Sequence, residues 1–213
     1  LHALPVDNLW PSRGHDHSAA DTTRMAEEIF RRFIIWVEAD FQIGRNALGF
    51  IPQLLEQFSS NLTQLEEIES LLCFGRADAR FANVIARPDG QLGLVDWEDC
   101  GLRDPARDLG DLLTHPNQED LLDMIKWQAF LSPYLAERIQ VDPTIGRRLD
   151  LYLAAFPIFW LAVLVNAGVD RAISGKIDDW RINDLSKNLQ LRRYLARALA
   201  WPNPDFSSVL EDL

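Results

Sequence analysis

A predicted β-hairpin near residue 90 most constrains the fold of this chain, because strong β signals occur only around it. The pair Asp89-Gly90 stands between two short apolar runs, and Asp-Gly in that setting is typical of a two-residue hairpin turn. Such a turn would place Asn83 directly opposite Asp96, with their side chains on one face of the hairpin. We therefore expect an amide and a carboxylate to meet at its open end.

Helical periodicity dominates the rest of the chain. The pair Asp104-Pro105 predicts an N-cap followed by proline at the first helical position, which begins a helix through Leu113. A short buried strand is expected at 71–74, and β signals are confined to about residues 70–96. Further helices are expected at 25–41, 46–59, a short segment from Asn61, 117–139, 143–167 and 183–200. The predicted fold class is mostly α with a small β-hairpin element (α+β).

Composition narrows the classes of partner. The 213 residues carry a net charge of -11, which argues against nucleic acid and favours a cationic small molecule. An acidic surface that only keeps the protein in solution explains the charge equally well. The longest apolar run, at 151–167, is broken by Pro157 and contains Asn166, so no membrane span is expected. Cys73 and Cys100 are expected to be free thiols in a reducing cytoplasm.

Three polar residues around the hairpin predict a phosphate-linked metal site. Asp78 precedes Asn83 by five residues, and Asn83 and Asp96 are expected to converge. Magnesium is commonly held by one or two carboxylates together with substrate phosphates, so this set suits an ion bound to a nucleotide. The simpler alternative is a loop-capping aspartate and two polar residues that end strands.

The segments around these residues resemble the aminoglycoside phosphotransferase family, which shares the protein-kinase-like fold. The similarity covers residues 71–113, and the flanks agree with the family only in helical character. The family has His-Gly-Asp, four further residues and Asn, then a hairpin and an Ile-Asp-Trp or Ile-Asp-Phe motif. The matching stretches here are Arg-Ala-Asp-Ala-Arg-Phe-Ala-Asn at 76–83, Leu-Val-Asp-Trp-Glu-Asp at 94–99 and Gly-Leu-Arg-Asp-Pro-Ala-Arg-Asp-Leu at 101–109.

The resemblance implies a role for each matching residue. Asp78 would be the catalytic base that accepts the proton of the substrate hydroxyl, and Asn83 and Asp96 would hold Mg²⁺. Asp108 would be the buried aspartate that braces the catalytic loop. The three residues that follow the metal ligand Asp96 could line the acceptor pocket; they are Trp97, Glu98 and Asp99. An equally good interpretation has Trp97 packed in the core and the two acids solvated.

The chain departs from the family at several positions. Arg76-Ala77 replaces His-Gly, and Phe81 replaces the usual proline. We expect Arg76 to support the loop, either simply tolerated there or paired with an acidic neighbour such as Asp96. No lysine precedes the hairpin, since the three lysines are Lys126, Lys176 and Lys187, and no glycine-rich phosphate motif is present.

These departures predict that residues 1–213 are the carboxy-terminal lobe alone, which binds substrate and metal. The amino-terminal nucleotide lobe, normally present in cis, is expected to be absent, because Leu1–Pro5 resembles the run that ends the helix after the hinge in this family. The expected activity is transfer of the γ-phosphate of ATP, or GTP, to a hydroxyl of a small amine-bearing alcohol such as an aminoglycoside or choline. The isolated lobe should be inactive. The alternative is a catalytically weak or inactive kinase-like binding or scaffold protein.

Overall fold

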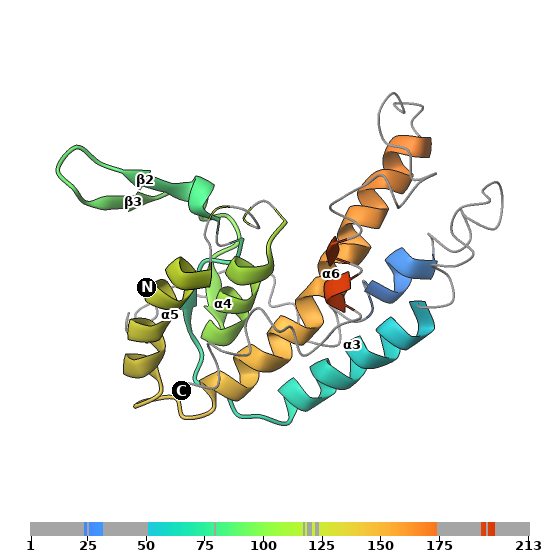
Figure 1. The fold of residues 1–213 in the computed structure, drawn as a ribbon, viewed down its shortest axis with the longest axis horizontal. Coiled ribbons are helices and arrows are strands. Elements are labelled where there is room, and N and C mark those ends of the chain that lie inside the picture. The colour runs from blue at the N-terminus through green and yellow to red at the C-terminus, as the bar shows by residue number, and fades with distance from the viewer. Residues whose placement is uncertain are drawn as a thin grey trace. The chain divides into compact units, whose positions relative to one another are not determined.

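The structure is a computed structural model, and it describes residues 24, 26–31, 51–78, 80–116, 118, 121, 124–173, 193–194 and 196–198. Helices dominate this part of the chain (Figure 1), as α3 (Ile51–Glu66), α4 (Pro105–Thr114), α5 (Met124–Arg138) and α6 (Ile145–Ile173). The strands are three residues each, and the predicted α+β class is confirmed. The helices expected at 25–41 and 183–200 lie mostly outside the described residues, although 26–31, 193–194 and 196–198 are helical.

Two compact units divide the chain. One contains residues 67–153, and the other contains 18–66 and 154–204. In the second unit, α3 buries Leu54, Phe58, Leu62 and Leu65, whose spacing of three and four residues defines one helix face. Because that face continues past residue 59, the helix runs to Glu66 and includes the segment predicted to start separately at Asn61.

The α6 helix begins in the first unit and continues in the second. Pro157 lies inside this helix and is buried. The sequence prediction ended the helix at residue 167, six residues before its observed end at Ile173. Despite this length, none of the helices in the described ranges has an apolar stretch sufficient to span a bilayer.

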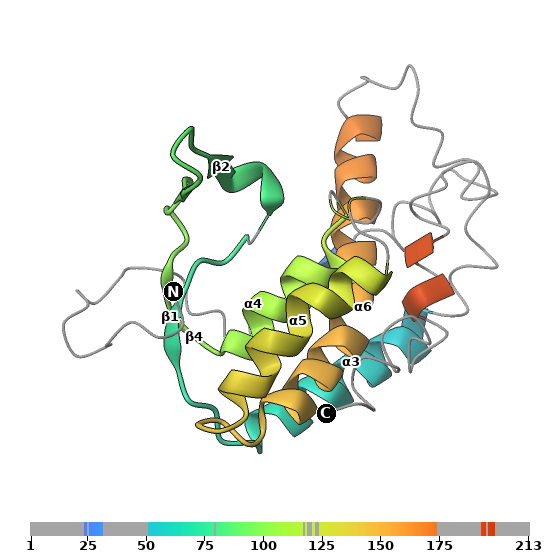
Figure 2. The same ribbon diagram turned by 60° about the vertical axis from the view of Figure 1, so that its left-hand side comes forward.

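Two small antiparallel sheets lie in the first unit. β1 (Cys73–Gly75) pairs with β4 (Gly101–Arg103), and Figure 2 shows β4 leading directly into α4. The sequence predicted β1 with bounds that begin two residues too early, and it did not predict β4. Leu71 and Leu72 are about half exposed and precede β1 rather than forming it, and β4 was not expected because β signals seemed to end at residue 96.

The hairpin is formed by β2 (Val84–Ala86) and β3 (Leu92–Leu94), but its predicted register was wrong by one residue. Ala86 lies opposite Leu92, and the backbone N–H of Val95 donates to the carbonyl of Asn83. Asn83 therefore faces Val95 and not Asp96. The cause is the turn, which has three residues, 88–90, and a positive φ of 79° at Gly90 alone. A two-residue type I′ turn needs positive φ at both central positions.

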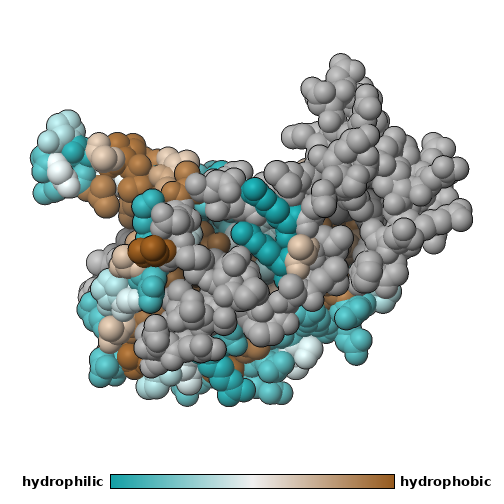
Figure 3. Space-filling view, in the orientation of Figure 1, coloured by the Kyte–Doolittle hydropathy of each residue, from teal (hydrophilic) through white to brown (hydrophobic). Residues whose placement is uncertain are grey.

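The hairpin extends away from α4 and α5 (Figure 1), and its outer side chains are apolar up to a hydrophilic tip (Figure 3). Leu92 is 69% exposed and Ile85 is 50% exposed. The short β2–β3 pair is therefore held to the unit mainly through the residues at its open end.

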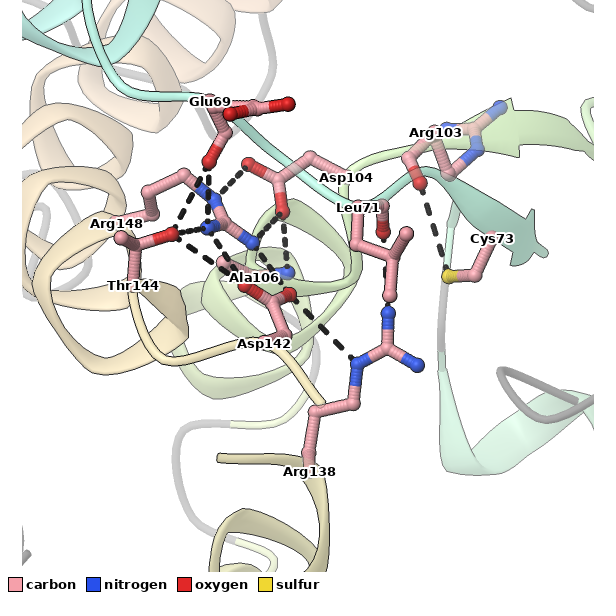
Figure 4. Close-up of polar contacts among 10 residues, drawn as sticks. All are labelled: Glu69, Leu71, Cys73, Arg103, Asp104, Ala106, Arg138, Asp142, Thr144 and Arg148. Carbon is pink, nitrogen blue, oxygen red and sulfur yellow. Dashed lines mark hydrogen bonds and ion pairs between the residues drawn. The ribbon is translucent and has the colours of Figure 1, made fainter. Parts of the chain in front are cut away.

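A buried arginine contacts the end of the β1–β4 sheet at which β1 begins and β4 ends (Figure 4). Arg148 is fully buried, and its Nε donates to Asp104 Oδ2 at 2.9 Å while its Nη2 donates to Asp142 Oδ2 at 2.7 Å. It also donates to the carbonyl of Glu69 at 3.2 Å. Burial alone would lower the pKa of Arg148, but hydrogen bonds to Asp142 and Asp104 raise it above its ordinary value.

The same cluster begins α4. Asp104 Oδ1 accepts a hydrogen bond from the N–H of Ala106 at 2.9 Å, and Pro105 is the first helical residue, so the predicted N-cap is confirmed. Arg138 donates to the carbonyl of Leu71 at 3.1 Å, just before β1. Both strands of the β1–β4 sheet are thus anchored at the end remote from residues 76–83, which follow β1.

Candidate active site

The catalytic-loop segment, residues 76–83, leaves β1 and is held by α4 and the turn that follows it. The N–H of Arg76 donates to Asp108 Oδ2 at 2.9 Å in the first part of α4. The N–H of Phe81 donates to Oε1 of the buried Gln118 at 2.8 Å, while Gln118 Nε2 donates to the carbonyl of Leu112 at 3.1 Å. The backbone N–H groups of Arg76 and Phe81 are therefore satisfied by one side chain of α4 and one of the turn after it.

Gly75 makes the first of these contacts sterically feasible. A Cβ at this position would lie 2.5 Å from Asp108 Oδ2 and 2.3 Å from Arg103 Cγ, both closer than van der Waals contact. Only glycine lets β1 approach the aspartate closely enough for the next residue to donate its N–H. Asp108 is buried as the sequence predicted, and its proposed bracing role agrees with this geometry.

Asp78 lies in a tight left-handed stretch of backbone. Ala77 has a φ of 50° and Asp78 a φ of 39°, a region that glycine adopts without steric cost and other residues rarely do. The Asp78 carboxylate pairs with Arg80 Nη2, and its Oδ1 lies 3.4 Å from His115 Nε2. Its side chain remains about a third exposed, so the carboxylate is fixed on one side and accessible on the other.

Asn83 and Asp96 do meet, although by a different route from the one predicted. Asn83 Nδ2 donates to Asp96 Oδ2 at 3.0 Å, and Asp96 has a φ of 66°. The left-handed conformation of Asp96 turns its side chain back toward Asn83 even though the hairpin register does not pair the two residues. Arg80 Nη2 lies 3.7 Å from the same carboxylate oxygen.

Arg80 therefore connects Asp78 to Asp96, whereas the sequence had suggested Arg76 as a possible partner of Asp96. Arg76 is buried instead, and its Nη2 donates to the carbonyl of Asp78 at 3.3 Å. The supporting role of Arg76 stays a prediction, with which its burial and this bond agree, whereas the arginine that contacts Asp96 is Arg80.

The donor set fits a magnesium ion bound to a nucleotide better than a protein metal cage. It consists of one amide and one carboxylate, from Asn83 and Asp96, and the described residues contain no cluster of three or more His, Cys, Asp or Glu side chains suited to a metal. Magnesium retains waters and takes phosphate oxygens where protein ligands are few. Asn83 is 9% exposed and Asp96 about a third, so one face of the pair is open to a ligand.

The three residues predicted to line the acceptor pocket directly follow Asp96 in the chain. Trp97 stacks on Phe74 with ring centroids 6.0 Å apart, and its Nε1 donates to the carbonyl of Leu94 at 2.9 Å. Trp97 is 37% exposed, so the interpretation that it is buried in the core was wrong. Glu98 and Asp99 are exposed.

An apolar cavity of about 550 Å³ lies between the hairpin and helices α4 and α5. Phe81 borders it and packs against Trp127 and Phe130, with ring centroids 5.8 and 6.2 Å away. The aromatic residue that replaces the family's proline thus anchors the loop to α5. Arg76 and Arg80 line the cavity on the side of the polar cluster.

Three residues that hold the site were not predicted from the sequence. Arg80 lies within the matching motif, and its position two residues after Asp78 was the available signal. His115 and Gln118 lie beyond the end of α4, where nothing local distinguishes them from ordinary surface residues. Their importance comes from contacts with residues 37 positions earlier in the chain.

Comparison with known proteins places the chain in a family. The model of the phosphotransferase enzyme family matches residues 2–147, so this chain belongs to that family. A choline/ethanolamine kinase family protein from Mesorhizobium loti is 21% identical with a TM-score of 0.53, and the match covers 99% of this chain and 60% of that one. The choline kinase LicA from Streptococcus pneumoniae is 18% identical with a TM-score of 0.51, covering 82% and 54%.

These similarities show the protein-kinase-like fold. The chain spans 60% or less of the two solved proteins it resembles. The family match confirms the family expected from the sequence, and the structural similarities confirm the expected fold.

Proposed function

We propose that this chain carries the acceptor and metal half of a small-molecule kinase. The observation that carries the proposal is the continuous polar cluster in which Arg80 contacts both Asp78 and Asp96, while Asn83 donates to Asp96. Phosphoryl transfer depends mainly on positioning and on neutralisation of phosphate charge, and this cluster holds the group types needed for both. Membership of the phosphotransferase enzyme family supports the reaction class.

Asp78 would orient the substrate hydroxyl and accept its proton. Its carboxylate is fixed by Arg80 and by the strained loop backbone, yet it is partly exposed toward an incoming alcohol. A base must lie within hydrogen-bond reach of the proton that it accepts, and a fixed carboxylate achieves this with little loss of entropy on binding.

Asn83 and Asp96 would hold Mg²⁺ together with the phosphates of ATP or GTP. The ion, when bound, neutralises charge that develops on the phosphate oxygens. Arg80 lies between the metal pair and the base, so its guanidinium would adjoin the transferred group. We place the lysine and covering loop for the remaining phosphates outside residues 1–213, in an amino-terminal lobe, because no lysine precedes the hairpin here.

A small amine-bearing alcohol is the substrate class we favour. The net charge of -11 and the exposed acids Glu98 and Asp99 beside Trp97 would attract a cation, and Trp97 offers a partly exposed aromatic face. Two structural neighbours, a choline/ethanolamine kinase family protein and a choline kinase, are named for substrates of this class. The free thiols of Cys73 and Cys100 support a cytoplasmic location.

The ion pair between Arg80 and Asp78 also favours a second candidate, a kinase-like binding protein without catalysis. A carboxylate engaged by an arginine is a poor base until the arginine moves. Binding of Mg-ATP and of the alcohol without product formation would indicate this second function.

The test uses the full-length gene product that contains this chain. ADP release would be measured with ATP, Mg²⁺ and a panel containing choline, ethanolamine and an aminoglycoside, with neutral alcohols for comparison. Asp78→Asn should lower turnover by about two to four orders of magnitude, because it removes the base at constant volume. Asp89→Asn, at the exposed hairpin tip, is the matched control and should retain wild-type turnover.

Near wild-type turnover by Asp78→Asn would refute the role given to Asp78. No phosphorylation of any alcohol by the wild-type full-length protein would refute the kinase proposal. Expressed alone, residues 1–213 should turn over little, and robust activity would refute the placement of the nucleotide lobe elsewhere.

A further inference from the structure

His115 approaches Asp78 from a part of the chain that the family motif does not include. It is the C-cap of α4, only 6% exposed, and its Nε2 lies 3.4 Å from Asp78 Oδ1. Its backbone is fixed on both sides, because its N–H donates to the carbonyl of Asp111 at 2.8 Å and its carbonyl accepts from the N–H of Gln118 at 2.9 Å. The imidazole is thus presented to the carboxylate by a rigid turn.

A neutral imidazole suits this position better than a charged one. Burial lowers the pKa of His115 below its ordinary value of 6.5, and the charge of Arg80 lowers it further, although Asp78 opposes both effects. A neutral ring with its proton on Nε2 directs an N–H dipole at the carboxylate without adding a formal charge. It can therefore orient Asp78 as a neutral hydrogen-bond donor.

Arg80 cannot fix Asp78 throughout the reaction in the same way. Its side chain is about 30% exposed, and it also contacts Asp96, so it lies where a phosphate group would compete for it. His115 is buried behind the loop. If Arg80 contacted a phosphate instead of Asp78, His115 would still contact the base.

We propose that His115 is a positioning residue, which holds the carboxylate of Asp78 in the orientation that accepts the substrate proton. The proposal rests on the proposed function, because it assigns a reaction role through Asp78. It differs from the interpretation of His115 as an ordinary buried histidine, which would predict loss of stability on substitution with no selective effect on turnover.

Steady-state kinetics of the full-length gene product distinguish the two interpretations. His115→Gln retains an N–H near the position of Nε2, whereas His115→Leu keeps comparable bulk without a donor. We expect His115→Leu to lower kcat by on the order of tenfold or more while KM for ATP stays within about twofold, since a misplaced base affects the transition state. His115→Gln should recover most of kcat.

Thermal unfolding of each variant is measured alongside as a control for folding. Equal kcat losses in the two variants, or wild-type kcat in His115→Leu, would overturn the positioning role. So would a change confined to KM.

Nuclear magnetic resonance of residues 1–213 tests the contact without any assay of activity. Imidazole ¹⁵N shifts should show His115 mainly in the Nε2–H form, and Asp78→Ala should move these shifts because it removes the acceptor. Asp89→Ala at the hairpin tip is the control and should leave them unchanged. Insensitivity of the His115 signals to Asp78→Ala would overturn the proposal, whereas an inactive wild-type enzyme with the expected spectrum would refute the kinase function alone.

Discussion

Replacement of Arg148 by methionine should sharply destabilise the first unit. The substitution removes a fully buried guanidinium that donates to two carboxylates, of which Asp142 is 3% exposed and Asp104 is 9% exposed. Breaking a buried ion pair by deleting one partner costs about 3–5 kcal/mol, because the remaining charge is left uncompensated. For a chain of 150–250 residues this loss corresponds to a fall in Tm of roughly 6–20 °C.

Urea unfolding followed by far-ultraviolet circular dichroism measures this effect. Arg147→Met is the matched control, because Arg147 is the exposed neighbour on the same helix and its removal should change the free energy of unfolding by less than about 0.5 kcal/mol. Adding Asp142→Asn to Arg148→Met should recover part of the loss by neutralising one of the two carboxylates that lose Arg148; Asp142 keeps the charge of Arg138, whose Nε lies 3.7 Å from its Oδ2. The reasoning fails if Arg148→Met unfolds like Arg147→Met, or if the double variant is no more stable than the single one.

Two further predictions concern backbone strain and thiol reactivity. Ala77→Gly should stabilise the chain by about 1 kcal/mol in the same urea assay, because Ala77 has a φ of 50°. The control is Ala86→Gly in the extended strand β2, which should destabilise the chain, and no gain from Ala77→Gly would contradict the left-handed conformation. Burial, and then the charge of Asp108, raise the pKa of the Cys73 thiol to about 12. Iodoacetamide at pH 8 should therefore alkylate Cys100 well before Cys73, as measured by mass spectrometry. Equal alkylation rates at the two thiols would refute this prediction.

Local sequence was sufficient for the parts of the site that depend on local chemistry. Asp104-Pro105 predicted the start of α4 because capping involves residues two positions apart. The hairpin was also predicted, but its register was not, since Asp89-Gly90 is compatible with both a two-residue and a three-residue turn. The observed turn uses Pro88 as well, and this shifts every cross-strand pair by one residue.

Contacts between distant segments were beyond such reasoning. Strand β4 is three residues long and starts with glycine, so its pairing with β1 is visible only once both segments are placed. Arg148 lies 44 residues from Asp104, and no periodicity marks it as buried. The meeting of Asn83 and Asp96 was predicted from an incorrect register, and the left-handed backbone at Asp96 is what produces it.

The attachment of the catalytic loop to α4 has a consequence for how the loop opens. The amides of Arg76 and Phe81 donate to side chains of Asp108 and Gln118 rather than to neighbouring backbone. Because both acceptors belong to α4 or to the turn after it, we expect these two amides to be protected from hydrogen exchange together with α4. The backbone on both sides of Asp78 is then held by side-chain acceptors, although the only regular element described in residues 76–83 is a 3-10 turn at Phe81–Asn83.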